Sequence, residues 1–183
     1  MKGGTGPMTH VCIYRLGAAL VLAAALLLPI SLANAQSVDW SAAREAGDLA
    51  DRANIIRPAN QPMSALASVN VPVLLPALSG SVLTREGGDS GLMFYPRGNL
   101  YTASFHYGGV DVSVSGASGA APATAPDEWT RTEYGQSLNF SRFGAAYVIE
   151  VRCSDPARGG NCTSESFIRR IHGQLVVAGG SGL

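Results

Sequence analysis

The sequence predicts an α+β domain, in which two β-hairpins and edge strands form an antiparallel sheet accompanied by two short helices. Two observations predict the sheet: apolar and polar residues alternate over 101–115, around a Gly-Gly pair, and again over 138–153. Helical spacing of apolar residues near each end of the mature chain predicts the helices. Because strands outnumber helices, an open β-sandwich is the alternative.

The first predicted elements lie between residues 39 and 76. Apolar residues recur at helical spacing over 39–53, which predicts an amphipathic helix that ends before Pro58. Residues 58–70 are predicted to form a loop. In 71–76 two prolines surround three large apolar residues, a pattern typical of an edge strand or of an extended segment packed on the core.

The strongest alternation begins at Tyr101. After a predicted loop over 79–91 and a short strand over 92–95, residues 101–107 and 110–114 alternate on either side of Gly108-Gly109. Two glycines between alternating runs predict a hairpin with a two-residue turn. One face of that hairpin is apolar and the other is rich in hydroxyl groups, so we expect the apolar face to cover the core.

A second hairpin is predicted further along the chain. Residues 115–126 contain only small residues and proline and are predicted to form a mobile surface loop. No strand is predicted in the polar stretch 127–136. Alternation then returns at Leu138 and Phe140, bends at Phe143-Gly144, and continues to Cys153.

The last predicted elements are a helix and a strand. Thr163 is placed to cap a short helix that ends at Gly173, and the acidic and basic residues of this segment suit the helix dipole. Residues 175–178 are predicted to form the final strand.

The first 35 residues have the three parts of a cleavable secretory signal peptide. Basic Lys2 and Arg15 precede an apolar run over 16–30, and Ala33-Asn34-Ala35 supplies the small residues that a signal peptidase requires. We therefore expect cleavage before Gln36. The predicted division is a leader over 1–35, a helix and loop over 36–70, and one α+β domain with one disulfide over 71–183.

The charge of the mature chain argues against nucleic-acid partners. Eleven of the thirteen Lys and Arg residues and all thirteen Asp and Glu residues follow residue 35, which leaves a formal net charge of −2. Nucleic-acid binding requires clustered positive charge. No stable membrane span is expected after the leader is removed, because the only long apolar run lies within it.

Cys153 and Cys162 are the cysteines that remain in the mature chain. In an oxidising compartment we expect them to form one disulfide, which closes a loop rich in turn-forming residues. A loop of about ten residues corresponds to roughly 2.5 kcal/mol of stabilisation on a chain-entropy model.

His106 and Asp111 are the most reactive pair that the predicted register brings together. They lie directly opposite each other on the hydroxyl-rich face of the first hairpin, and Ser104 and Ser113 face the same side. An aspartate beside a histidine suits a general base, and a serine could supply a nucleophile. The same pair also suits simple stabilisation of an exposed sheet, and this structural interpretation is preferred.

Other candidate sites concern binding. Arg169 and Arg170 form a basic cluster that suits an anionic component of the cell envelope, and Trp129 is a candidate anchor for a partner protein. No cofactor and no metal site are expected, because the mature chain keeps two histidines and its cysteines are assigned to the disulfide.

These features together predict an exported bacterial protein, periplasmic or secreted, that acts by contact. An envelope accessory, an inhibitor and a binding module all fit this description, and none of them is an enzyme. The alternative is a small secreted hydrolase that uses His106 and Asp111.

Overall fold

The computed structural model describes residues 37–49, 55–77, 91–119, 126–155 and 160–183, and the structural statements below concern these ranges. The predicted leader over 1–35 lies outside them, so the signal peptide and the division into segments stay predictions. The predicted loop over 79–91 also lies outside them, except for Gly91.

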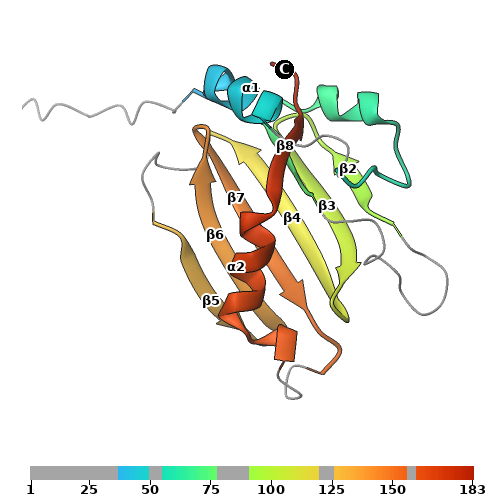
Figure 1. Ribbon diagram of the computed structural model, residues 1–183, viewed down its shortest axis with the longest axis vertical. Helices are drawn as coiled ribbons and strands as arrows, with labels where there is room; N and C mark the ends of the chain where they lie inside the picture. Colours follow the sequence, from blue (N-terminus) through green and yellow to red (C-terminus); the bar gives the residue numbers. More distant parts are fainter. Residues whose placement is uncertain (1–36, 50–54, 78–90, 120–125, 156–159) are drawn as a thin grey trace, which may run out of the picture. The chain divides into compact units, whose positions relative to one another are not determined.

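The described residues form two antiparallel sheets and a few short helices (Figure 1). The larger sheet has the strand order β2-β3-β4-β7-β6-β5, and the smaller one pairs β1 with β8. The strands are β1 (Val73–Pro76), β2 (Met93–Pro96), β3 (Leu100–Tyr107), β4 (Val110–Ser118), β5 (Glu128–Thr132), β6 (Gly135–Arg142), β7 (Ala145–Arg152) and β8 (Leu175–Gly179). The α+β class is therefore confirmed.

One face of the six-stranded sheet carries the remaining elements. Helix α2 (Glu165–Gly173) packs against β6 and β7, and β1 packs against β4, so that α2 and the β1–β8 pair lie on the same face (Figure 1). Helix α1 (Trp40–Leu49) contacts β8, and the 3-10 helix η2 (Met63–Ser68) contacts β2 and β8. We call this covered face the inner face and the opposite one the outer face.

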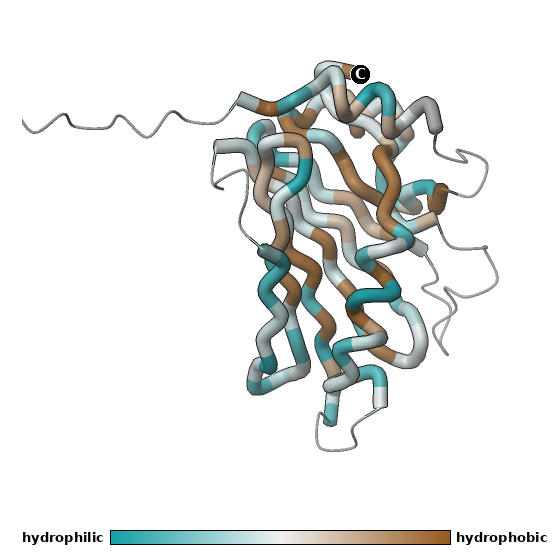
Figure 2. Tube along the Cα trace, turned by 60° about the vertical axis from the view of Figure 1, so that its left-hand side comes forward, coloured by the Kyte–Doolittle hydropathy of each residue, from teal (hydrophilic) through white to brown (hydrophobic). Residues whose placement is uncertain are grey.

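The hydrophobic core lies between the inner face and these elements. Alternate residues of the central strands are buried, and apolar and polar residues accordingly alternate along the chain trace (Figure 2). The buried residues of α2 are Phe167, Ile168 and Ile171. The strand period of two therefore determines which side chains enter the core and which remain on the outer face.

Both predicted hairpins are confirmed. Strands β3 and β4 pair in the predicted register around Gly108 and Gly109, whose φ angles are 61° and 81°. Strands β6 and β7 turn at Phe143 and Gly144, with φ angles of 54° and 72°. Two successive positive φ angles are the requirement of the tight turns whose twist matches that of paired strands.

Two predictions between the hairpins were wrong. Strand β4 continues through Ser118, because residues 115–118 pair with β7, so the predicted loop begins too early; residues 120–125 lie outside the described ranges. The polar stretch 127–136 contains strand β5, which pairs with β6. Its residues are mostly exposed, and an exposed strand carries no apolar alternation to reveal it.

The helix boundaries also differ from the prediction. Ser164, and not Thr163, is the residue that precedes α2, and its side chain makes no capping hydrogen bond. The segment 58–70, predicted as a loop, contains η2. The strands predicted over 71–76, 92–95 and 175–178 are present with shifts of one or two residues at their ends.

Candidate functional site

Polar side chains from three neighbouring strands meet on the outer face. His106 of β3 lies opposite Asp111 of β4, which in turn lies opposite Arg152 of β7. One row along the strands, Ser104 lies opposite Ser113, and Ser113 opposite Glu150. The predicted set of His106, Asp111, Ser104 and Ser113 is thus brought together, and β7 adds a carboxylate and a guanidinium to it.

The His106–Asp111 pair is in hydrogen-bond contact. His106 Nδ1 lies 3.0 Å from Asp111 Oδ1, with side chains 23% and 63% exposed. When Nδ1 carries the proton, it donates to the carboxylate, which fixes the plane of the ring and leaves Nε2 for another partner. The pair is therefore accessible from solvent while the orientation of the imidazole is constrained.

A second polar chain links β4 to β7. The hydroxyl of Ser113 donates to Glu150 Oε2 at 3.5 Å, and Arg152 Nη2 donates to the same oxygen at 3.2 Å. In the next row, Thr102 and Ser115 hydrogen-bond to each other at 2.9 Å. The outer face in this region is consequently a floor of hydroxyl groups with its charged groups paired among themselves.

A pocket of about 770 Å³ lies over this floor. It is lined by Thr102, Ser104, His106, Asp111, Ser113, Ser115, Glu150 and Arg152, with Ala59, Gly91 and Met93 on the side of β2. A second pocket, of about 510 Å³, shares His106, Asp111 and Arg152 with the first and reaches the disulfide. The two hollows therefore adjoin each other at these three residues.

The serine hydroxyls do not complete a catalytic triad in the described residues. A serine nucleophile requires its hydroxyl within hydrogen-bond reach of the imidazole. No described hydroxyl hydrogen-bonds to His106, and Ser113 contacts Glu150 instead. The arrangement is suited to binding a polar ligand through many donors and acceptors.

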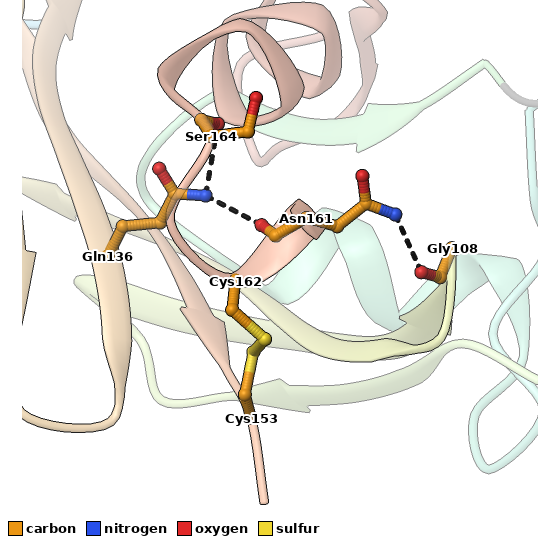
Figure 3. Close-up of a disulfide and its surroundings, with 6 residues drawn as sticks. All are labelled: Gly108, Gln136, Cys153, Asn161, Cys162 and Ser164. Carbon is orange, nitrogen blue, oxygen red and sulfur yellow. Dashed lines mark hydrogen bonds between the residues drawn. A yellow bond between two sulfur atoms is a disulfide. The ribbon is translucent and has the colours of Figure 1, made fainter. Parts of the chain in front are cut away.

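The disulfide anchors the far end of this region (Figure 3). Cys153 follows β7, and its bond to Cys162 holds η4 (Gly160–Cys162) beside the sheet, with 5.9 Å between the two Cα atoms. The predicted pairing of these cysteines is thus present. Asn161 Nδ2 then donates to the carbonyl oxygen of Gly108 at 2.7 Å, which ties the disulfide segment to the β3–β4 turn.

A buried amide connects the same segment to β6. The Gln136 residue is 1% exposed, and its Nε2 donates to the carbonyl oxygens of Asn161 at 2.8 Å and of Ser164 at 3.1 Å. Its Oε1 accepts from Trp129 Nε1 at 2.8 Å. The Trp129 indole packs against the core, so the structure places this predicted anchor within the fold; its role in binding stays a prediction.

The predicted basic cluster lies on α2, on the other side of the sheet from the pocket. Arg169 pairs with Glu165 at 2.7 Å and lies 4.0 Å from Asp127, while Arg170 is exposed. His172, one turn further, lies 3.6 Å from Asp127, and burial lowers its pKa despite that carboxylate. Arg169 and Arg170 are therefore not brought together with the outer-face residues.

Glu150 and Arg152 are the site residues that the sequence does not connect with His106 and Asp111. Their alternation with the buried Ile149 and Val151 marks them as facing the outer side. The sequence carries no signal that places β7 next to β4, however, so their meeting with Ser113 and Asp111 follows only from the strand order.

Among the described residues, no three His, Cys, Asp or Glu side chains gather closely enough to hold a metal ion. No helix within the same ranges combines the length and apolarity needed to cross a membrane. Comparison of the chain with protein-family models, with curated proteins and with solved structures finds no match.

Proposed function

We propose that the mature chain, residues 36–183, is an exported binding module that acts by contact and not by catalysis. The contact surface is the outer face of the six-stranded sheet, around Ser113 and Glu150. The partner is a component of the cell envelope, either a protein or a polymer.

The pocket of about 770 Å³ over the outer face is the observation that carries this proposal. A binding site combines a concave surface with a few convergent polar groups that orient the ligand. The floor of this pocket supplies hydroxyl groups together with the His106–Asp111 and Glu150–Arg152 pairs. The paired charges keep these side chains in fixed positions, which reduces the ordering cost of binding.

Export is supported by the leader pattern over 1–35 and by the disulfide, a bond that forms and persists in oxidising compartments. Intact mass spectrometry of the protein from the culture medium and from the periplasm tests it. We expect a chain that begins at Gln36 with its two cysteines oxidised. A full-length chain with free thiols in the cytosol would contradict export.

The contact surface is tested by backbone NMR of the mature protein. Neutral oligosaccharides, tripeptides and anionic phospholipid vesicles serve as probes, added one class at a time. We expect one class to shift the amide signals of Ser104, Ser113 and Glu150, and Ser113→Leu to abolish those shifts. Shifts confined to Arg169 and Arg170 on α2 would show that the outer face is not the contact surface.

The alternative function is a small secreted hydrolase. The 3.0 Å contact between His106 and Asp111 at the pocket favours it, since this geometry orients the ring of a general base. A screen of esters, amides and glycosides tests it with the mature protein and with His106→Ala. An activity that disappears in this variant, and weakens in Asp111→Asn, would replace the binding proposal.

A further inference from the structure

Two pockets adjoin each other at the end of the six-stranded sheet, and we call them together the cleft. The first is lined by residues from β2, β3, β4 and β7, and the second lies between the β3–β4 turn and the disulfide. His106, Asp111 and Arg152 line both, so they stand at the junction. A cleft with two compartments of about 770 and 510 Å³ suits an extended ligand better than a single compact one.

The charges of the cleft disfavour an anionic ligand. Apart from His106, Arg152 is the one basic residue among the described residues that line the cleft. The guanidinium of Arg152 pairs with Glu150 at 3.2 Å. Asp111, which lines both pockets, pairs with His106 at 3.0 Å. An anionic ligand would have to compete with these two carboxylates for Arg152 and His106, whereas a neutral ligand leaves both pairs in place.

The chemistry of the floor favours a ligand with many hydroxyl groups. The cleft lies on the face of a sheet, where backbone N–H and C=O groups are used in the strand ladder, so recognition depends on side chains. The Ser104 hydroxyl can both donate and accept, as sugar hydroxyls do, and the hydroxyls of Thr102, Ser113 and Ser115, which hydrogen-bond within the protein, keep acceptor sites. Met93, 37% exposed on β2, adds an apolar surface for the C–H face of a sugar ring.

We propose that the ligand of this cleft is a neutral linear oligosaccharide or polysaccharide that occupies both pockets and crosses the His106–Asp111–Arg152 junction. This inference rests on the proposed function, because it names the class of partner for the same outer face. The reducing and non-reducing units of a longer chain lie in different pockets, and the middle of the chain lies over the junction.

The disulfide segment is the wall of the second pocket. Cys153, Asn161 and Cys162 line it, and the 2.7 Å bond from Asn161 to Gly108 holds that wall against the β3–β4 turn (Figure 3). Removing this bond should therefore loosen the second pocket and leave the first intact. Asn161 is thus a positioning residue for the longer ligands only.

Isothermal titration calorimetry with neutral oligomers of glucose and of N-acetylglucosamine, from two to six units, tests the inference. We expect affinity to rise with length. Glu150→Gln should weaken binding of every length by about tenfold, because hydrogen bonds to charged groups are the strong ones. Glu165→Gln on α2 is the matched control and should bind like the wild type. Asn161→Ala should weaken only the longer oligomers.

The outcomes separate this inference from the proposed function. Equal affinity for two-unit and six-unit oligomers, or an equal effect of Asn161→Ala on both, would overturn the elongated cleft. Binding of a tripeptide or of an anionic polymer at Glu150 and Ser113, with no neutral sugar bound, would overturn the ligand class and leave the contact surface in place. No shift of outer-face NMR signals with any probe would overturn both. Circular dichroism melting of each variant confirms that it is folded.

Discussion

The hydroxyl group of Tyr101 in β3 hydrogen-bonds to both backbone polar groups of Leu74 in β1. It accepts from the N–H at 2.8 Å and donates to the C=O at 3.2 Å, and both residues are fully buried. The register of β1 against β8 is irregular between Val73 and Leu74. The tyrosine thus satisfies backbone groups that would otherwise be buried against an apolar sheet.

Tyr101→Phe should lower the free energy of unfolding by about 1–3 kcal/mol, because it leaves the Leu74 N–H and C=O without this partner. Tyr147→Phe is the matched variant, since Tyr147 donates a single hydrogen bond to the Pro72 carbonyl at 2.9 Å. Urea unfolding of both should show the larger loss for Tyr101→Phe. An equal or smaller loss would mean that the Leu74 contacts contribute little.

Stability should fall steeply in alkali. Burial raises the pKa of Tyr101, and burial together with the nearby Tyr101 raises the pKa of Tyr147. The folded state therefore disfavours the phenolate form of both tyrosines. The free energy of unfolding keeps its full value below the ordinary tyrosine pKa of about 10 and decreases as the pH rises above it. Phenolate absorbance and circular dichroism followed against pH should change together. A double Tyr101→Phe, Tyr147→Phe variant should show a shallower alkaline decline relative to its neutral stability.

Gly116 lies beneath the same two tyrosine rings. A Cβ atom at this position would lie 2.5 Å from Tyr101 Cε1 and 2.8 Å from Tyr147 Cε1. Gly116→Ala should therefore cost about 1–3 kcal/mol through overpacking. Gly173→Ala in α2 is the control, because nothing lies within 4 Å of its added Cβ, and it should leave stability equal or higher. Thermal melts that rank the two variants in the opposite order would refute this packing.

His172 should make the domain less stable in mild acid. Burial against Phe140, 4.3 Å between ring centroids, lowers its pKa, whereas Asp127 opposes the shift. The unfolded chain then binds a proton more readily, so stability decreases as the pH falls below the ordinary value of about 6.5. Unfolding in urea at a series of pH values should show a shallower decrease for His172→Gln and a steeper one for Asp127→Asn. Identical slopes in all three proteins would exclude His172 as the cause.

Gln136 and Gln174 offer a matched test of buried amides. The Gln136 side chain makes three hydrogen bonds, to Trp129, Asn161 and Ser164. Gln174 Oε1 is buried without a hydrogen-bond partner among the described residues. Gln136→Leu should lower the free energy of unfolding by about 1–3 kcal/mol, whereas Gln174→Leu should leave it nearly unchanged or raise it. Chemical denaturation that finds equal costs would contradict the assigned network.

Some of the candidate site could be predicted from the sequence and some could not. The tight turn at Gly108-Gly109 sets the register of its hairpin, so His106 opposite Asp111 was predictable from a few neighbouring residues. Strand β5 was not predictable, because Trp129 is its one large apolar residue. Its place in the sheet depends on pairing with β6. The pocket was not predictable either, because it combines residues of β2, β3, β4 and β7.

Local sequence patterns were sufficient for the two hairpins, for the separation of apolar from hydroxyl-bearing faces, and for the pairing of Cys153 with Cys162. These depend on the period of a strand, the geometry of a two-residue turn, and the presence of two cysteines after residue 35. The position of β7 beside β4, which brings Glu150 to Ser113 across 37 residues of sequence, follows from the tertiary fold alone. Strand order depends on how the whole apolar face packs against α2 and β1, and no local segment carries that information.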